Sequence, residues 1–117
     1  MSKSRVLIIV IFTSIAVWLG EAGLFFFVLM GFGISGNPIV ALLVMAISTL
    51  STLVPSSPGY IGPFHLAAFS AILILGGNPE IAGSFAVLSH LSIWIPTTLA
   101  GAIAISIRPS LFYGKNL

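Results

Sequence analysis

The side chains that could do chemistry are few, and most of them lie within apolar sequence. Glu21 lies deep inside an apolar segment, where a carboxylate is costly and is expected to face the interior of a helix bundle. There it could exchange a proton, pair with a cationic headgroup, or hold two helices together through a hydrogen bond. His65 begins a later apolar segment, His90 lies within the last one, and Trp94 follows His90 by one turn on the same face. Glu21 and His90 are therefore the ionisable residues most suited to a role inside a membrane.

A run rich in proline and glycine is the most informative motif. It reads Val54-Pro55-Ser56-Ser57-Pro58-Gly59-Tyr60-Ile61-Gly62-Pro63, which no continuous helix tolerates. Irregular backbone inside a membrane persists only within protein or beside a water-filled cavity, and its N–H and hydroxyl donors could bind a headgroup phosphate. A plain cytoplasmic turn is the alternative. The candidate lipid-binding or headgroup-binding residues are Pro55, Ser56, Ser57, Pro58, Gly59, Tyr60, Gly62 and His65.

The sequence has no pattern typical of an enzyme. It contains no cysteine, phosphate-binding loop, zinc-binding spacing or catalytic triad. Two histidines on neighbouring helices could in principle bind a haem, but nothing else in the sequence supports a haem site. We therefore expect no catalytic residues, no metal and no cofactor.

The composition indicates an integral membrane protein. Of the 117 residues, 58% are hydrophobic and 5% are charged, whereas a soluble domain carries roughly 25% charged residues. The four cations lie at the two ends of the chain, so they do not form a nucleic-acid-binding patch. A basic start followed by apolar residues is also typical of a signal peptide, but the apolar stretch continues far beyond the small residues that could mark a cleavage site.

Breaks in the sequence divide the chain into about four hydrophobic helices within one transmembrane domain, residues 1–117. The segments are 6–32, 38–54, 64–75 and 79–107, the last interrupted by Pro96, and Phe25 and its two phenylalanine neighbours are expected to face lipid. Asn37-Pro38 and Asn78-Pro79 are typical helix starts, with Asn as N-cap. At about 1.5 Å per residue the second and third segments are shorter than a bilayer core of about 30 Å. A re-entrant hairpin is therefore favoured, although two full spans stay open.

The cations also predict the orientation. Lys3 and Arg5 precede the first segment, and Arg108 and Lys115 follow the last. An even number of crossings places both ends on one side, and positive charge places that side in the cytoplasm. We expect a multi-pass protein of the cell membrane with cytoplasmic N- and C-termini and a short cytoplasmic tail, residues 108–117.

A shift of 41 positions aligns the second segment with the fourth. Matches of this kind also arise by chance in apolar sequence, so a true repeat and a coincidence both remain open. A true repeat would be of the parallel kind and would make Pro96 a functional break. The aligned pairs include Asn37 with Asn78, Pro38 with Pro79, Ala41 with Ala82, Ser48 with Ser89, and Pro55 with Pro96.

The Pro/Gly run, extended to Phe64-His65, resembles the signature of the flippase-like family, the lysylphosphatidylglycerol synthase transmembrane region. That signature is a Pro-(Ser/Thr)-x-Pro/Gly-Gly-x-x-Gly run followed by a small or hydroxyl residue, an aromatic residue, and Glu or His. Here Pro63 replaces the usual hydroxyl residue, and His65 stands where Glu is frequent. Trp18-Leu19-Gly20-Glu21 also resembles the helix that precedes the signature. The resemblance covers the C-terminal portion of a larger family domain.

The resemblance implies a lipid-handling membrane protein that binds or translocates a modified phospholipid or a lipid-linked headgroup. It does not imply an enzyme, because the transferase chemistry of the lysyl-lipid synthases belongs to a separate soluble domain. Membrane lipids are the expected partners, together with further helices supplied by a homo-oligomer or a partner chain. The alternatives are a small proton-coupled exporter that uses Glu21 and a structural membrane subunit.

Overall fold

The computed structural model describes residues 3–109, and this part of the chain is helical with no strand. Its main elements are α1 (Lys3–Gly31), α2 (Pro38–Leu50), α3 (Pro63–Ile74) and α4 (Pro79–Ile107). Two 3-10 turns, η1 (Ser51–Leu53) and η2 (Pro58–Tyr60), lie between α2 and α3. The prediction of four apolar helices, two of them short, is confirmed. The expected tail lies almost wholly outside the described residues.

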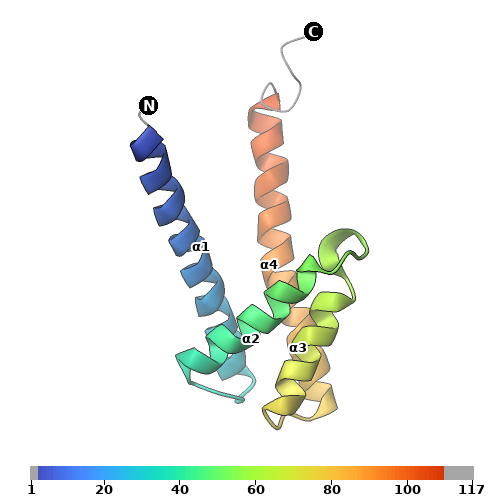
Figure 1. Cartoon of the computed structure of the whole chain (residues 1–117). Coiled ribbons are helices and arrows are strands. Elements are labelled where there is room, and N and C mark those ends of the chain that lie inside the picture. Colours follow the sequence, from blue (N-terminus) through green and yellow to red (C-terminus); the bar gives the residue numbers. More distant parts are fainter. Residues whose placement is uncertain (1–2, 110–117) are drawn as a thin grey trace.

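The long helices α1 and α4 have the length and composition needed to cross a membrane. Each has 29 residues, which corresponds to about 43 Å. The start of α1 and the end of α4 lie at the same end of the molecule (Figure 1). The helices α2 and α3, with 13 and 12 residues, reach only about 20 Å.

Between the long helices, α2 and α3 form a hairpin that turns back halfway (Figure 1). The tip of this hairpin, residues 54–62, lies beside the middle of α4, where His90 Nε2 is 2.8 Å from the carbonyl oxygen of Gly59. This geometry favours the re-entrant arrangement over four full spans. We call residues 54–62 the hairpin tip.

Both predicted helix starts are confirmed. The Asn37 side chain accepts a hydrogen bond from the Ile39 N–H (2.9 Å), and Asn78 accepts one from the Ile81 N–H (2.8 Å). Proline occupies the first position of each helix, where its missing N–H costs nothing.

The predicted interruption at Pro96 is wrong, because α4 continues through this residue to Ile107. Proline removes one backbone donor from the helix. The Thr97 hydroxyl lies within hydrogen-bond distance of the carbonyl oxygens of Ile93 (2.8 Å) and Trp94 (3.1 Å). A hydroxyl that engages carbonyls beside a proline is one way in which membrane helices accommodate it.

The packed core occupies the half of the molecule in which all four helices meet. Phe25, Leu29, Ile72 and Phe85 are fully buried, and the Phe25 and Phe85 rings meet edge to face with centroids 6.0 Å apart. Phe25 is thus a core residue and not the lipid-facing residue that was expected, while its neighbour Phe27 is exposed. In contrast, residues 3–20 of α1 and residues 94–109 are exposed throughout, so the outer arms of the long helices carry little of the packing.

The turn between α3 and α4 yields a test of this packing. A Cβ on Gly77 would lie 2.5 Å from Cγ2 of Ile72 and 3.1 Å from its carbonyl oxygen, and Ile72 is fully buried and cannot move aside. Gly77→Ala should therefore lower the free energy of unfolding by about 1–3 kcal/mol. Gly83→Ala, whose Cβ meets nothing within 4 Å, is the control and should not destabilise the protein. Thermal unfolding in detergent measures both, and equal midpoints for the two variants would contradict the packing described here.

Candidate functional site

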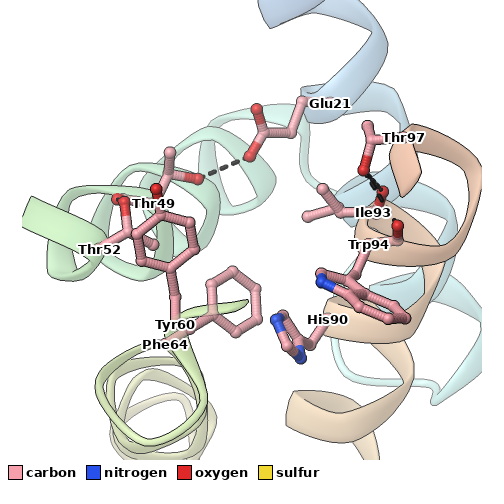
Figure 2. Close-up of a pocket in the computed structure, with 9 residues that line it drawn as sticks. All are labelled: Glu21, Thr49, Thr52, Tyr60, Phe64, His90, Ile93, Trp94 and Thr97. Atoms are coloured by element: carbon pink, nitrogen blue, oxygen red, sulfur yellow. Dashed lines mark hydrogen bonds between the residues drawn. The ribbon is translucent and has the colours of Figure 1, made fainter. Parts of the chain in front are cut away.

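A cavity of about 240 Å³ opens between α1, the hairpin and α4. Every helix of the fold contributes to it, and Figure 2 shows the side chains converging on one central space. Glu21 comes from α1, Thr49 from α2, Thr52 from η1, and Tyr60 from the hairpin tip. We call this cavity the central pocket. Its lining residues are Glu21, Thr49, Thr52, Tyr60, Phe64, His90, Ile93, Trp94 and Thr97.

The central pocket lies about halfway along the long helices. Glu21 is about ten residues from the end of α1, and His90 is about eleven residues from the start of α4. At about 1.5 Å per residue both lie roughly 15 Å from the end of the molecule that carries the α1–α2 and α3–α4 turns. If the turns mark one boundary of a bilayer core about 30 Å thick, this distance corresponds to mid-depth.

Glu21 is held in place by the second helix. The Thr49 hydroxyl donates a hydrogen bond of 2.6 Å to Oε1 of Glu21. Short hydrogen bonds to a carboxylate are the strong kind, and this one is partly buried. The bond fixes one carboxylate oxygen, and the carboxyl group as a whole lies on the wall of the central pocket (Figure 2).

The hairpin tip is fixed by backbone that only glycine adopts easily. Gly59 has φ +79°, and a Cβ there would lie 3.3 Å from Nε1 of Trp94. The Gly59 carbonyl accepts the hydrogen bond of His90 Nε2 when this nitrogen carries the proton. The tip therefore sits closely against α4, and its Tyr60 side chain reaches the pocket.

The pocket combines one acid with aromatic rings. Among its nine lining residues there is one carboxylate and no lysine or arginine. Tyr60 and Trp94 supply ring faces, which attract cations. The threonine hydroxyls of residues 49, 52 and 97 already bond within the protein. An ammonium group is thus the chemistry that this wall suits best, while a phosphate would find no cation other than a protonated His90.

The predicted site residues are only partly brought together. Glu21, Tyr60 and His90 line the central pocket, and Gly59 contributes its carbonyl to the docking of the tip. The other five predicted residues of the hairpin tip do not line it, and neither does His65. Ser57 instead donates its hydroxyl to the Ile61 carbonyl at 2.9 Å, which closes the tip on itself. The residues away from the pocket are Pro55, Ser56, Ser57, Pro58 and Gly62.

His65 does not line the central pocket and lies on the other side of the hairpin from it. It lines grooves on the outer face of α3 and α4, its ring meets that of His90 with centroids 4.6 Å apart, and its buried Nδ1 has no hydrogen-bond partner. In the described part of the chain no three His, Asp or Glu side chains gather in a way that could hold a metal ion.

Sequence reasoning did not select several residues of the pocket. Thr49 and Thr52 lie one turn apart just before the hairpin tip, and the shift of 41 positions aligns Thr49 with His90. Following that alignment one residue beyond Ser48 would have found Thr49. Phe64 was noted only as the aromatic residue of the family signature and was not selected as a site residue.

The comparison with known families decides the identity. Residues 1–101 match the model of the lysylphosphatidylglycerol synthase TM region. The chain belongs to this family. All residues of the central pocket fall within the matched part of this lysylphosphatidylglycerol synthase TM region. No curated protein and no solved structure matches the chain.

The Glu21–Thr49 bond can be tested by removing its donor. Thr49→Val keeps the shape of the side chain and should lower the free energy of unfolding by about 1 kcal/mol, a typical value for a hydrogen bond within a membrane protein. The Thr52 hydroxyl bonds to its own helix at the Thr49 carbonyl, so Thr52→Val is the matched control and should change little. Unfolding in mixed micelles measures both. A Thr49 variant as stable as the control would contradict a structural role for the bond.

Proposed function

We propose that the central pocket binds the amine-bearing headgroup of a modified phospholipid within the membrane, as a step in moving that lipid between leaflets. The observation that carries this proposal is a single carboxylate, Glu21, set among aromatic rings at mid-depth of a chain from a lipid-related family. The chain itself catalyses no reaction in this proposal.

The position of Glu21 supports a ligand rather than a purely structural role. A charged side chain near the bilayer centre costs about 2.5–3.5 kcal/mol. One hydroxyl donor bonds to one of its two oxygens, and membrane hydrogen bonds contribute only about 1 kcal/mol. An ammonium group entering the pocket would offset much more of this cost, because it supplies both charge and donors.

The shape of the molecule supports access for a lipid. Beyond the pocket, the arms of α1 and α4 diverge toward their terminal ends (Figure 1) and expose apolar side chains along their length. Acyl chains can lie between these arms while the headgroup occupies the pocket. With Lys3, Arg5 and Arg108 at that end, we expect it to face the cytoplasm at the cell membrane, following the positive-inside rule.

The chain offers a built-in reporter for binding. Its two tryptophans are Trp18 on the exposed arm of α1 and Trp94 in the pocket. In a Trp18→Phe background, the fluorescence of Trp94 should change on titration of lysylphosphatidylglycerol into nanodiscs of phosphatidylglycerol. Glu21→Gln should weaken this binding about tenfold or more, since it removes the charge while keeping an acceptor for Thr49.

Glu80→Gln is the matched control, because Glu80 is an exposed carboxylate in the first turn of α4. It should leave binding unchanged. If Glu21→Gln binds the amine lipid as tightly as Glu80→Gln does, the proposed function is wrong.

A further inference from the structure

The two helical hairpins, α1–α2 and α3–α4, are built on one plan. The first helix of each ends in the same cap, with a bond from the Ile34 N–H to the Leu29 carbonyl (3.0 Å) and one from the Gly77 N–H to the Ile72 carbonyl (2.9 Å). A glycine with positive φ precedes the donor in both cases. The second helix of each begins with the Asn-Pro start described above.

Burial follows the same plan. The first helices correspond through a shift of 43 positions and the second helices through 41, because the first turn, residues 32–37, is two residues longer than the second, residues 75–78. Corresponding residues are buried together, including two serines. The pairs in which both members are buried are Phe25 and Ala68, Leu29 and Ile72, Ala41 and Ala82, Val44 and Phe85, Met45 and Ala86, and Ser48 and Ser89.

The outer surfaces repeat as well. Each hairpin has an apolar groove between its two helices on the side away from the central pocket. The grooves are lined at corresponding positions, namely Ala22 and His65, Gly23 and Leu66, Phe26 and Phe69, and Leu42 and Gly83. These correspondences support a true repeat that extends to α1 and α3.

Corresponding residues of the two hairpins meet in the central pocket. In Figure 1, α1 and α3 run in one direction and α2 and α4 in the other, as in a parallel repeat. Three corresponding pairs have both members in the lining of this cavity. These pairs are Glu21 and Phe64, Thr49 and His90, and Thr52 and Ile93.

Corresponding residues also make corresponding contacts. In the first hairpin Thr49 bonds to Glu21. In the second hairpin His90 packs on Phe64 with ring centroids 5.1 Å apart. Phe64 therefore contacts His90 of α4 in the way that Glu21 contacts Thr49 of α2. The difference is that position 64 carries an aromatic ring where position 21 carries a carboxylate.

We infer that Phe64 determines the specificity of the pocket by making it one-sided. Glu21 receives a single amine of the ligand, and Phe64, at the equivalent position of the second hairpin, receives an uncharged part. This inference rests on the proposed function. A carboxylate at position 64 would have His90 beside it as a potential donor. It would create a second amine site facing the first.

The test measures binding of a headgroup with two amines, lysylphosphatidylglycerol, and one with a single amine, phosphatidylethanolamine, by Trp94 fluorescence in nanodiscs. The wild type should bind both with similar affinity. Phe64→Glu should raise the preference for the diamine roughly tenfold. Phe64→Gln supplies a neutral acceptor and replaces Phe64→Glu in the test if a buried carboxylate prevents insertion. It should raise the preference for the diamine roughly threefold. Phe64→Leu is the apolar control and should leave the preference unchanged.

An exchange of the two positions gives a second readout. Glu21→Phe alone should lose amine binding, and the double variant Glu21→Phe/Phe64→Glu should regain it, because one carboxylate returns at the equivalent position. Insertion and monodispersity in detergent establish that each variant is folded. Folded position-64 variants with the wild-type preference would overturn the inference while leaving the proposed function intact. Absence of amine binding by the wild type would overturn both.

Discussion

The structure depends on keeping the polar backbone of the hairpin tip satisfied far from water. Within a bilayer, unpaired N–H and C=O groups cost several kcal/mol each. Prolines in and beside the tip remove donors that would otherwise need partners. Within the tip, the Ile61 carbonyl accepts a hydrogen bond from the Ser57 hydroxyl and the Ser57 carbonyl accepts one from the Tyr60 N–H, while the Gly59 carbonyl lies 2.8 Å from His90 Nε2. The last contact requires α4 beside the tip, so the position of this long helix follows from the same requirement.

This constraint also builds the site. Since α2 and α3 are too short to cross, their polar ends stop at the depth of Glu21 and His90 instead of reaching the surface. Thr49 then meets Glu21, and Tyr60 turns into the same space. A membrane interior surrounds the pocket with low dielectric, in which a carboxylate interacts strongly with any cation that enters. The duplicated hairpin plan explains why polar residues from both halves meet at one point.

The helices and their starts were predictable because they depend on local rules: apolar runs, Asn-Pro caps and breaks at proline and glycine. The short second and third segments favoured a re-entrant hairpin over two full spans. The orientation of side chains in the tip could not be predicted, since irregular backbone has no periodicity, and so Ser57 was assigned to a ligand but bonds within the tip. Pro96 looked like a break, but it removes one backbone donor and α4 continues through it. Phe25 was expected to face lipid, but it packs on Phe85. Burial by a partner so distant in sequence could not be predicted from the local pattern.

The most direct test of this account is the membrane depth of the hairpin tip. The chain lacks cysteine, so single spin labels can be placed at Ser57 in the tip, at Ser35 in the α1–α2 turn and at Ser106 near the end of α4. Their relative collision rates with oxygen and with a water-soluble nickel complex in bilayers give each depth. We predict that the Ser57 label lies deepest, about 10 Å or more from either headgroup region. A Ser57 label at the same depth as Ser106 would mean that α2 and α3 cross the membrane, and would contradict the mid-depth pocket.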